Sequence, residues 1–143
     1  MSELLPIEDL SASDKKLVKL AFQARKKAHA PYSNYLVGSV VIDSRGKLFT
    51  GCNVENASYP ASLCAERTAI VKMVSRGGKQ IKKIIVAASS DEPVFPCGMC
   101  LQVIAEFGKK CEVIAVNRRG TTFRRAPFKE LFPYAFSSEK LNG

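Results

Sequence analysis

Three cysteines and one glutamate are the residues of this 143-residue chain whose types and spacing suit chemistry. Cys64 and Glu66 lie two positions apart in the stretch SLCAERTAI, where an apolar run begins. Cys97 and Cys100 form the C-x-x-C of PCGMC. The partial positive charge and free N–H groups of a helix start favour the thiolate form of a cysteine. We therefore expect these three thiols to meet at the starts of two helices.

Three thiolates are three ligands for zinc, with the fourth position left to water, as in catalytic zinc sites. We expect Gly98 to relieve crowding between Cys97 and Cys100. Two alternatives remain: a thioredoxin-like redox pair and a closed structural site with a fourth cysteine, either Cys52 or Cys111. Cys111 begins an apolar run and is interpreted as a small buried residue, whereas Cys52 ends a segment that leads towards the proposed site. The spacing favours the open three-cysteine site.

Glu66 is interpreted as the catalytic residue. A carboxylate near the metal can accept a proton from water and deliver it elsewhere, which is general acid/base catalysis. The alternative is a favourable negative charge at a helix start, and the three spaced cysteines favour catalysis. Arg67 either balances the charge of the thiolates or is a surface charge. His29, the only histidine, lies far in sequence from these cysteines, which argues against a nucleophile activated by histidine.

The elements that position these residues follow from the apolar patterns. We expect helices from Ser11 or Ser13 to about Ala28, over 64–75 and over 97–107, and a short one in PFKELF. Strands are expected over 36–43, 48–54, 82–90, 111–117 and in TTFRR. A hairpin followed by β–α–β crossovers builds a mixed sheet of about five strands flanked by helices. The sequence therefore predicts one α/β domain, residues 1–143, with both cysteine-bearing helices starting at the same edge of the sheet.

Composition and charge limit the location and the partners. The chain is 46% hydrophobic and 24% charged, as expected for a globular fold. No apolar run reaches the roughly 18 to 20 residues of a membrane span, and the start MSELLPIEDL does not resemble a signal peptide. We expect no membrane association and a cytoplasmic location. The net charge of +9 suggests an anionic partner such as nucleic acid, but no aromatic residues interleave the basic clusters. We interpret these clusters as solvated faces without excluding nucleic acid.

The motifs resemble those of the zinc-dependent nucleoside and nucleobase deaminases, and most closely those of the small homotetrameric cytidine deaminases. C-A-E-R is followed about thirty residues later by P-C-x-x-C. The further matching stretches, in family order, are APYSNYLVGS, GCNVENASYPASLCAERTA, PCGMCLQVIAEF and ELFPYAFSSEKL. The resemblance implies a three-layer α/β/α sandwich. It also implies hydrolytic deamination of cytidine and deoxycytidine to uridine and deoxyuridine, with release of ammonia, in pyrimidine salvage.

The resemblance also implies a role for each matching residue. Cys64, Cys97 and Cys100 would bind one Zn²⁺ per chain, and Glu66 would carry protons from water to the pyrimidine N3 and then to the departing amino group. The substrate contacts would be the Ala65 backbone N–H on the pyrimidine O2, Asn53 and Glu55 on the ribose 3′-hydroxyl, and Tyr35 beside the base. Arg67 and Gln102 look like partners of the thiolates.

Two aromatic residues imply active sites shared between the subunits of a homotetramer. Phe136 matches an aromatic that a neighbouring subunit lends to the site, and Tyr59 belongs to a loop that also crosses subunits. Three positions depart from the family pattern. Tyr35 stands where many members have Phe, so the pocket gains a hydroxyl. Leu101 replaces a common Arg, and Phe95 replaces a small residue. None of these three is a predicted metal ligand.

Two other functions remain open. One is a deaminase acting on another cytosine nucleoside or on RNA or DNA, although the segment NVENA favours free ribosides because it supplies the sugar contacts. The other is a non-catalytic, zinc-stabilised module that binds nucleic acid, which predicts a closed four-cysteine site and salt-sensitive binding.

Overall fold

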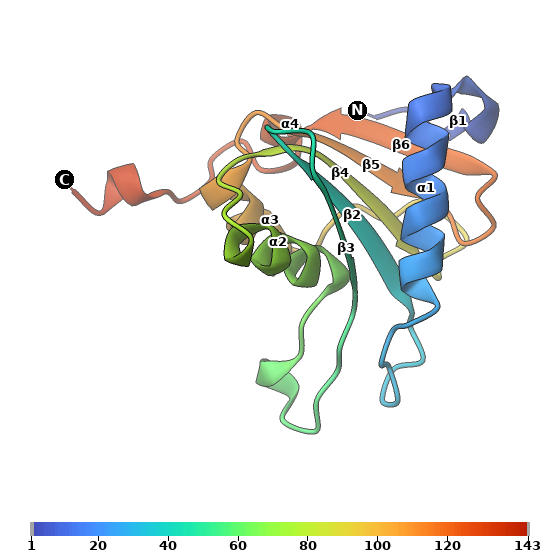
Figure 1. Cartoon of the computed structure of the whole chain (residues 1–143), viewed down its shortest axis with the longest axis horizontal. Helices are drawn as coiled ribbons and strands as arrows, with labels where there is room; N and C mark the ends of the chain where they lie inside the picture. Colours follow the sequence, from blue (N-terminus) through green and yellow to red (C-terminus); the bar gives the residue numbers. More distant parts are fainter. Residues whose placement is uncertain (1, 143) are drawn as a thin grey trace.

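A six-stranded mixed sheet forms the centre of the computed structural model, which describes residues 2–142 (Figure 1). The strand order is β1-β6-β5-β4-β2-β3. The strands are β1 (Leu5–Pro6), β2 (Val37–Asp43), β3 (Leu48–Cys52), β4 (Ile81–Ala88), β5 (Glu112–Val116) and β6 (Thr122–Pro127). β4 and β5 run parallel, and the other neighbouring strands run antiparallel. The five expected strands are present, and the two-residue edge strand β1 is a sixth that the sequence did not predict.

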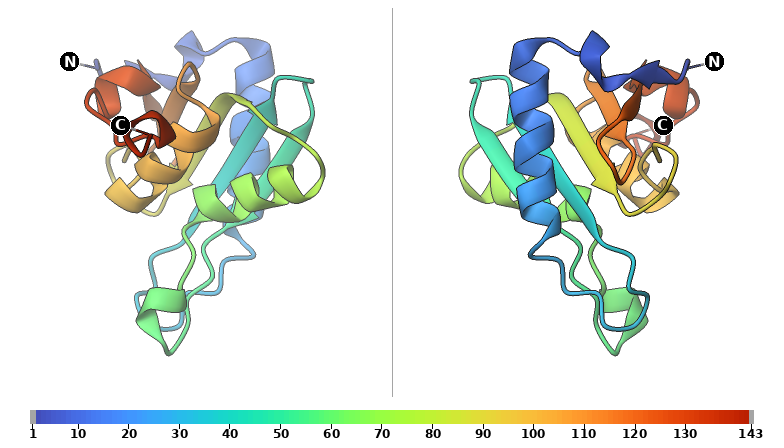
Figure 2. Two further views of the ribbon diagram at one scale, coloured as in Figure 1. Left: turned by 90° about the vertical axis from the view of Figure 1, so that its left-hand side faces the viewer. Right: turned by 90° about the vertical axis from the view of Figure 1, so that its right-hand side faces the viewer.

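Helices cover both faces of the sheet, which confirms the expected three-layer α/β/α sandwich. The helices are α1 (Ala12–Arg25), α2 (Ala65–Ser75), α3 (Gly98–Phe107) and α4 (Phe128–Leu131). Figure 2 shows α1 on one face and α2 with α3 on the other. Alternate residues of one strand point to opposite faces. Val40 and Ile85 accordingly belong to the core beneath α1, whereas Val41 and Ile84 belong to the core beneath α2 and α3.

Helix α1 begins as expected but ends earlier. The Ser11 hydroxyl accepts a backbone N–H of the first turn, which is the usual role of an N-cap serine. The helix ends at Arg25, three residues before the expected Ala28. Beyond it, the His29 N–H donates to the Asn53 carbonyl at 3.0 Å. This pairing with the chain after β3 draws the backbone out of the helix, and the helical sequence pattern does not reveal it.

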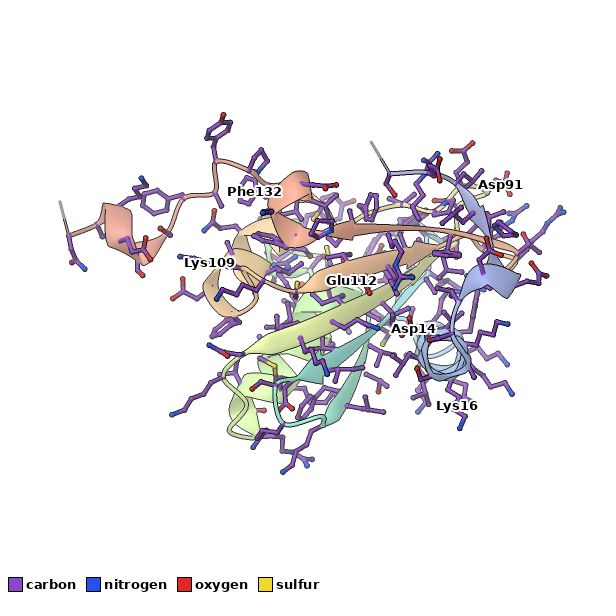
Figure 3. The ribbon with its side chains drawn as sticks, turned by 90° about the horizontal axis from the view of Figure 1, so that it is seen from above. Asp14, Lys16, Asp91, Lys109, Glu112 and Phe132 are labelled. Carbon is purple, nitrogen blue, oxygen red and sulfur yellow. The ribbon has the colours of Figure 1, made fainter. Side chains whose placement is uncertain are left out.

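An ion-pair network joins α1 to the sheet. Figure 3 labels two of its members, Asp14 and Glu112. Asp14 is buried in the first turn of α1, and its Oδ1 lies 2.7 Å from the Lys83 Nζ. Arg125 Nη2 lies 2.8 Å from the Glu112 Oε1 and 3.5 Å from the Asp14 Oδ2. Four charges on α1, β4, β5 and β6 therefore balance one another on this face, away from the cysteines.

The topology brings the starts of α2 and α3 to one edge of the sheet. β3 and β4 both pair antiparallel with β2, so both end at the same edge, where α2 and α3 begin, as expected. A Cβ at Gly51 would lie 2.4 Å from the Ala65 carbonyl oxygen and 2.6 Å from the Ala69 nitrogen. The glycine lets the first turn of α2 rest directly on β3. Within residues 2–142, no helix combines the length and apolar character that a membrane span requires.

Candidate active site

Three thiols converge where α2 and α3 begin. Cys64 is the N-cap residue of α2, Cys97 is the N-cap residue of α3, and Cys100 is buried in the first turn of α3. Their sulfur atoms all lie within 4.8 Å of one another, and the Cys64 and Cys97 Sγ atoms are 3.8 Å apart. The sequence-predicted cluster is therefore assembled from two separate helix starts.

The sulfur positions fit a tetrahedral zinc ion. Zn–S bonds of about 2.3 Å in tetrahedral geometry place two sulfurs roughly 3.8 Å apart, which matches the Cys64–Cys97 separation. Among the described residues, neither Cys52 nor Cys111 belongs to the cluster, so a closed four-cysteine site is not formed. Cys111 lies in the apolar core, as expected.

The expected role of Gly98 is wrong. A Cβ at this position would meet no atom within 4 Å. Because Cys97 precedes the helix and Cys100 lies in its first turn, their side chains reach the cluster without crowding the residue between them. A glycine at position 98 is therefore not required for room between the thiols.

Electrostatics at the cluster favour a thiolate on Cys64. A hydrogen bond from Cys100, together with Arg67 and Cys97, lowers the pKa of Cys64 to about 5, although burial opposes the shift. The same bond to Cys64, followed by burial, raises the pKa of Cys100. Arg67 Nη2 lies 3.6 Å from the Cys64 Sγ and donates to the Ser62 carbonyl at 3.2 Å. Arg67 is therefore placed to balance thiolate charge.

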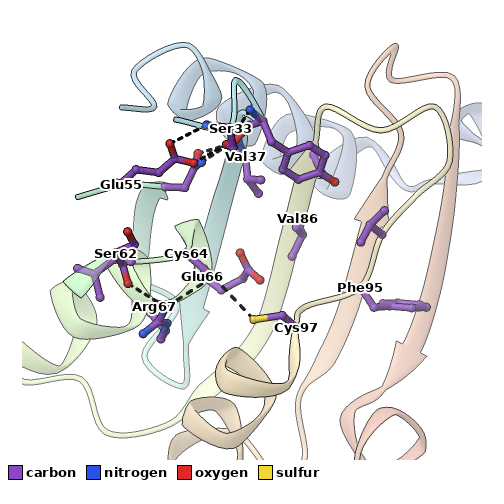
Figure 4. A pocket seen from close by; sticks show the side chains of 15 residues that line it. Ser33, Val37, Glu55, Ser62, Cys64, Glu66, Arg67, Val86, Phe95 and Cys97 are labelled. Carbon is purple, nitrogen blue, oxygen red and sulfur yellow. Dashed lines mark hydrogen bonds between the residues drawn. The ribbon is translucent and has the colours of Figure 1, made fainter. Parts of the chain in front are cut away.

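Glu66 is buried in the first turn of α2 and faces the same cavity as Cys64 and Cys97 (Figure 4). Burial raises the pKa of Glu66 to about 7, and the negative charge of Cys64 adds to this effect. Its carboxylate is thus held beside the thiols without belonging to the three-sulfur cluster. Such a group can accept a proton and return it within the cavity.

The cavity has a volume of about 430 Å³, within the usual range of small-molecule sites. Sequence reasoning did not identify several apolar residues of its wall, which are Val37, Leu63, Val86, Ala88 and Val94. Val86 and Ala88 lie near the end of β4. Because this buried strand ends at the edge where the site lies, its last residues could have been predicted from the sequence to line the cavity. Val94 lies in the irregular segment between β4 and α3, where no regular spacing of apolar residues predicts which side chains face the cavity. The departure Phe95 also lines this cavity.

Asn53 and Glu55 line the cavity and order the chain before β2. The Asn53 Oδ1 accepts the Val37 N–H at 2.9 Å, and its Nδ2 donates to the Tyr35 carbonyl at 2.7 Å. The Glu55 Oε1 accepts the backbone N–H groups of Tyr32 and Ser33 at 3.0 and 3.1 Å. An amide nitrogen has two hydrogens and a carboxylate has about four acceptor sites. Both side chains therefore keep capacity to bind a ligand hydroxyl.

The charge of Glu55 is also secured by these contacts. The Ser33 hydroxyl donates to the Glu55 Oε2. This bond and the backbone N–H groups of Tyr32 and Ser33 lower the pKa of Glu55, although desolvation opposes them. The side chain therefore remains an anionic acceptor.

Five sequence-predicted site residues do not line the cavity of their own chain: the buried Cys100, and Tyr59, Phe136, Gln102 and Ala65. Tyr59 is 71% exposed and packs edge-on against Tyr32 in the two loops that extend together from the sheet (Figure 2). Phe136 is exposed in the C-terminal segment, which runs away from the sheet (Figure 1). Gln102 Nε2 donates to the Phe136 carbonyl at 2.9 Å and thus points to this segment. Ala65 is fully buried as the first residue of α2.

Comparisons with known proteins agree with this arrangement. Residues 11–116 match the family described as the cytidine and deoxycytidylate deaminase zinc-binding region. A probable cytidine deaminase of Dictyostelium discoideum is 44% identical over 127 residues, covering 88% of this chain and 85% of that protein. The cytidine deaminase of Sporosarcina psychrophila is 41% identical, covering 89% and 93% of the two chains.

A solved structure agrees as well. The crystal structure of a cytidine deaminase from Burkholderia pseudomallei is 40% identical and has a TM-score of 0.81. The match covers 89% of this chain and 100% of the Burkholderia pseudomallei chain. The chain therefore belongs to the cytidine and deoxycytidylate deaminase family, which confirms the resemblance in the sequence motifs. The matched zinc-binding region contains all three clustered cysteines and Glu66.

Proposed function

We propose that this chain catalyses the hydrolytic deamination of cytidine and deoxycytidine to uridine and deoxyuridine, with release of ammonia. The observation that carries this proposal is the buried Glu66 carboxylate in a cavity shared with the converging thiols of Cys64 and Cys97. The family match and the cytidine deaminases among the relatives support the substrate class.

The three cysteines would hold zinc, and Glu66 would move the protons. Zinc bound by Cys64, Cys97 and Cys100 supplies the positive charge that makes water a nucleophile at neutral pH. Glu66 takes the first proton from the attacking water and gives it to the pyrimidine N3 as the water oxygen bonds to C4. Glu66 then carries the second proton of that water to the amino group. The C4–N bond breaks, ammonia leaves, and a C4 carbonyl remains.

Other residues would hold the nucleoside in place. The Ala65 backbone N–H lies at a helix start, where N–H groups lack helical partners, and would donate to the pyrimidine O2. Asn53 and Glu55 would bind the ribose 3′-hydroxyl with their remaining donor and acceptor capacity. The ring of Tyr35 and the side chain of Val86 would bound the base.

We also propose a cytoplasmic homotetramer with shared active sites, acting in pyrimidine salvage. Tyr59 and Phe136 support the assembly because both are exposed aromatic residues outside the cavity of their own chain. Phe136→Ala should lower kcat/KM for cytidine without loss of zinc. Analytical ultracentrifugation of the wild-type protein should give the mass of an assembly of four chains. A wild-type monomer with full activity would contradict the sharing of sites.

The direct test is ammonia release from cytidine, deoxycytidine, CMP and a short cytosine-containing RNA, with zinc content measured on the same sample. We expect turnover of the two nucleosides and about one zinc per chain. Zinc-loaded protein that is inert towards both nucleosides would refute the proposal. Turnover of the RNA alone would instead support an editing enzyme.

A further inference from the structure

Two adjacent serines after β4 bind the segment that leads into β2. The Ser89 hydroxyl donates to the Leu36 carbonyl at 2.8 Å, and the Ser90 hydroxyl is hydrogen-bonded to the Tyr35 hydroxyl. Tyr35 lines the cavity, but Ser90 does not. The tyrosine hydroxyl is therefore bound to a residue that does not itself line the cavity. The hydroxyl expected to enter the pocket is instead bound to Ser90.

The segment that contains Ser90 is held by contacts with α1 and with the turn after β5. The Ser90 carbonyl accepts the Arg118 N–H at 2.8 Å, and the Arg118 guanidinium pairs with Asp91 at 3.0 Å. Arg25 of α1 donates to the Ala88 carbonyl at 3.1 Å. Ser90 thus belongs to a segment fixed by α1 and by the turn between β5 and β6.

Tyr35 lies in a segment without helix or strand and is 38% exposed. A loop side chain of this kind is among those that lose rotamer freedom when a ligand binds. The hydroxyl bond restrains the ring before any ligand arrives, and a phenylalanine at this position would have no hydroxyl to make it.

We propose that Ser90 is a positioning residue, which orients the Tyr35 ring as a wall of the nucleoside cavity through the bond between their hydroxyls. The proposal rests on the proposed function, because the ring would then lie against the pyrimidine. An apolar contact of this kind is made equally in the ground state and the transition state, so its loss raises KM and leaves kcat unchanged.

The test compares Tyr35→Phe, Ser90→Ala and the double variant. Each single variant should raise the KM for cytidine about three- to tenfold, with kcat unchanged. The inhibition constant of uridine, a ligand that does not react, should rise by the same factor. The double variant should be no worse than either single variant, because both remove one bond. Ser90→Thr keeps the hydroxyl and should have the wild-type KM. Tyr134→Phe removes the hydroxyl of a 96% exposed tyrosine, so it is the matched control and should leave both KM and kcat unchanged.

The outcomes separate this inference from the proposed function. A wild-type protein that deaminates cytidine while Tyr35→Phe or Ser90→Ala keeps the wild-type KM overturns the role of Ser90 alone. Effects of the two single variants that multiply in the double variant also overturn it, because the residues would then act independently. A wild-type protein that neither deaminates cytidine nor binds uridine overturns both.

Discussion

The three thiols lie at the starts of two helices packed on the sheet, whereas Tyr35, Asn53 and Glu55, which are expected to bind sugar and base, lie in segments without helix or strand. The first region, the zinc end, comprises Cys64, Glu66, Cys97 and Cys100. The second, the loop end, comprises residues 31–36 and 53–62. Helical backbone bonds and apolar packing hold the zinc end. Side-chain hydrogen bonds made by Asn53 and Glu55 hold much of the loop end. Damage at the zinc end should therefore remove turnover, and damage at the loop end should mainly weaken binding.

Removal of zinc should have the largest effect. Protein stripped with a chelator should lose turnover of cytidine and unfold at a lower temperature, because a metal that binds only the folded state stabilises it. One equivalent of Zn²⁺ should restore both, as measured by ammonia release and thermal unfolding. Cys52→Ser is the control, since Cys52 lies outside the cluster, and should keep one zinc per chain. Full turnover by the stripped protein would contradict the role of the zinc end.

Gly51→Ala should have the next largest effect, because the new methyl group would collide with the backbone of α2. We expect a loss of about 1–3 kcal/mol in the free energy of unfolding and lower kcat, measured by urea unfolding and steady-state kinetics. Gly98→Ala is the matched control at the other helix start, where a Cβ meets open space, and should not destabilise the protein. Equal stability of the two variants would show that α2 does not depend on the close approach to β3.

Glu55→Gln should act on binding. The amide keeps one acceptor oxygen but loses the charge, and hydrogen bonds to charged groups are stronger than those between neutral groups. We expect KM for cytidine to rise about tenfold or more, with kcat much less affected and zinc content unchanged. Glu130→Gln, at an exposed position of α4, should leave KM as it is. If kcat falls while KM stays, the loop end is not simply a binding region.

Replacement of Asp43 should change the stability of the fold and leave substrate binding unchanged. Asp43 lies at the opposite end of β2 from Val37, a residue of the cavity wall, at a distance of roughly 20 Å along the strand. Burial alone would raise the pKa of Asp43, but hydrogen bonds from Lys47 and Arg45 hold it below its usual value. A carboxyl with a lowered folded pKa stabilises the fold above its unfolded pKa of about 4. That contribution disappears as the pH falls through the folded pKa.

Wild type should therefore be more stable than Asp43→Asn at pH 7, and this difference should shrink as the pH falls below about 4. Urea unfolding at several pH values measures the difference in free energy of unfolding between the two proteins. KM for cytidine should be the same in both proteins. A difference in stability that grows towards low pH would reverse the expected sign.

The zinc end was predictable from the sequence because metal-ligand residue types mark both helix starts, although Cys64 and Cys97 lie 33 positions apart. Cys97 and Cys100 share one helical turn, and both cysteine-bearing helices follow strands that end at one edge of the sheet. The loop end was not predictable from spacing, because the partners of Asn53 and Glu55 lie 16 to 23 residues away. No periodic pattern marks such contacts, and the family resemblance was needed to single these residues out.

Two features of the fold escaped prediction for similar reasons. β1 is only two residues long and contains Pro6, a residue that strands tolerate mainly at sheet edges. The Tyr35–Ser90 bond joins residues 55 positions apart, and neither residue type predicts the other. Contacts between distant irregular segments depend on the folded sheet that brings those segments together.

The central claim is that Glu66 moves protons in a cavity whose metal the three cysteines hold. Glu66→Gln tests it most directly, because the amide is nearly the same size but cannot take up the proton of water. We predict that this variant keeps about one zinc per chain and the wild-type fold, while kcat for cytidine falls by about 10² to 10⁴. Glu106→Gln, at an exposed position of α3, should keep wild-type kcat. Zinc-loaded Glu66→Gln protein with wild-type kcat would contradict the claim.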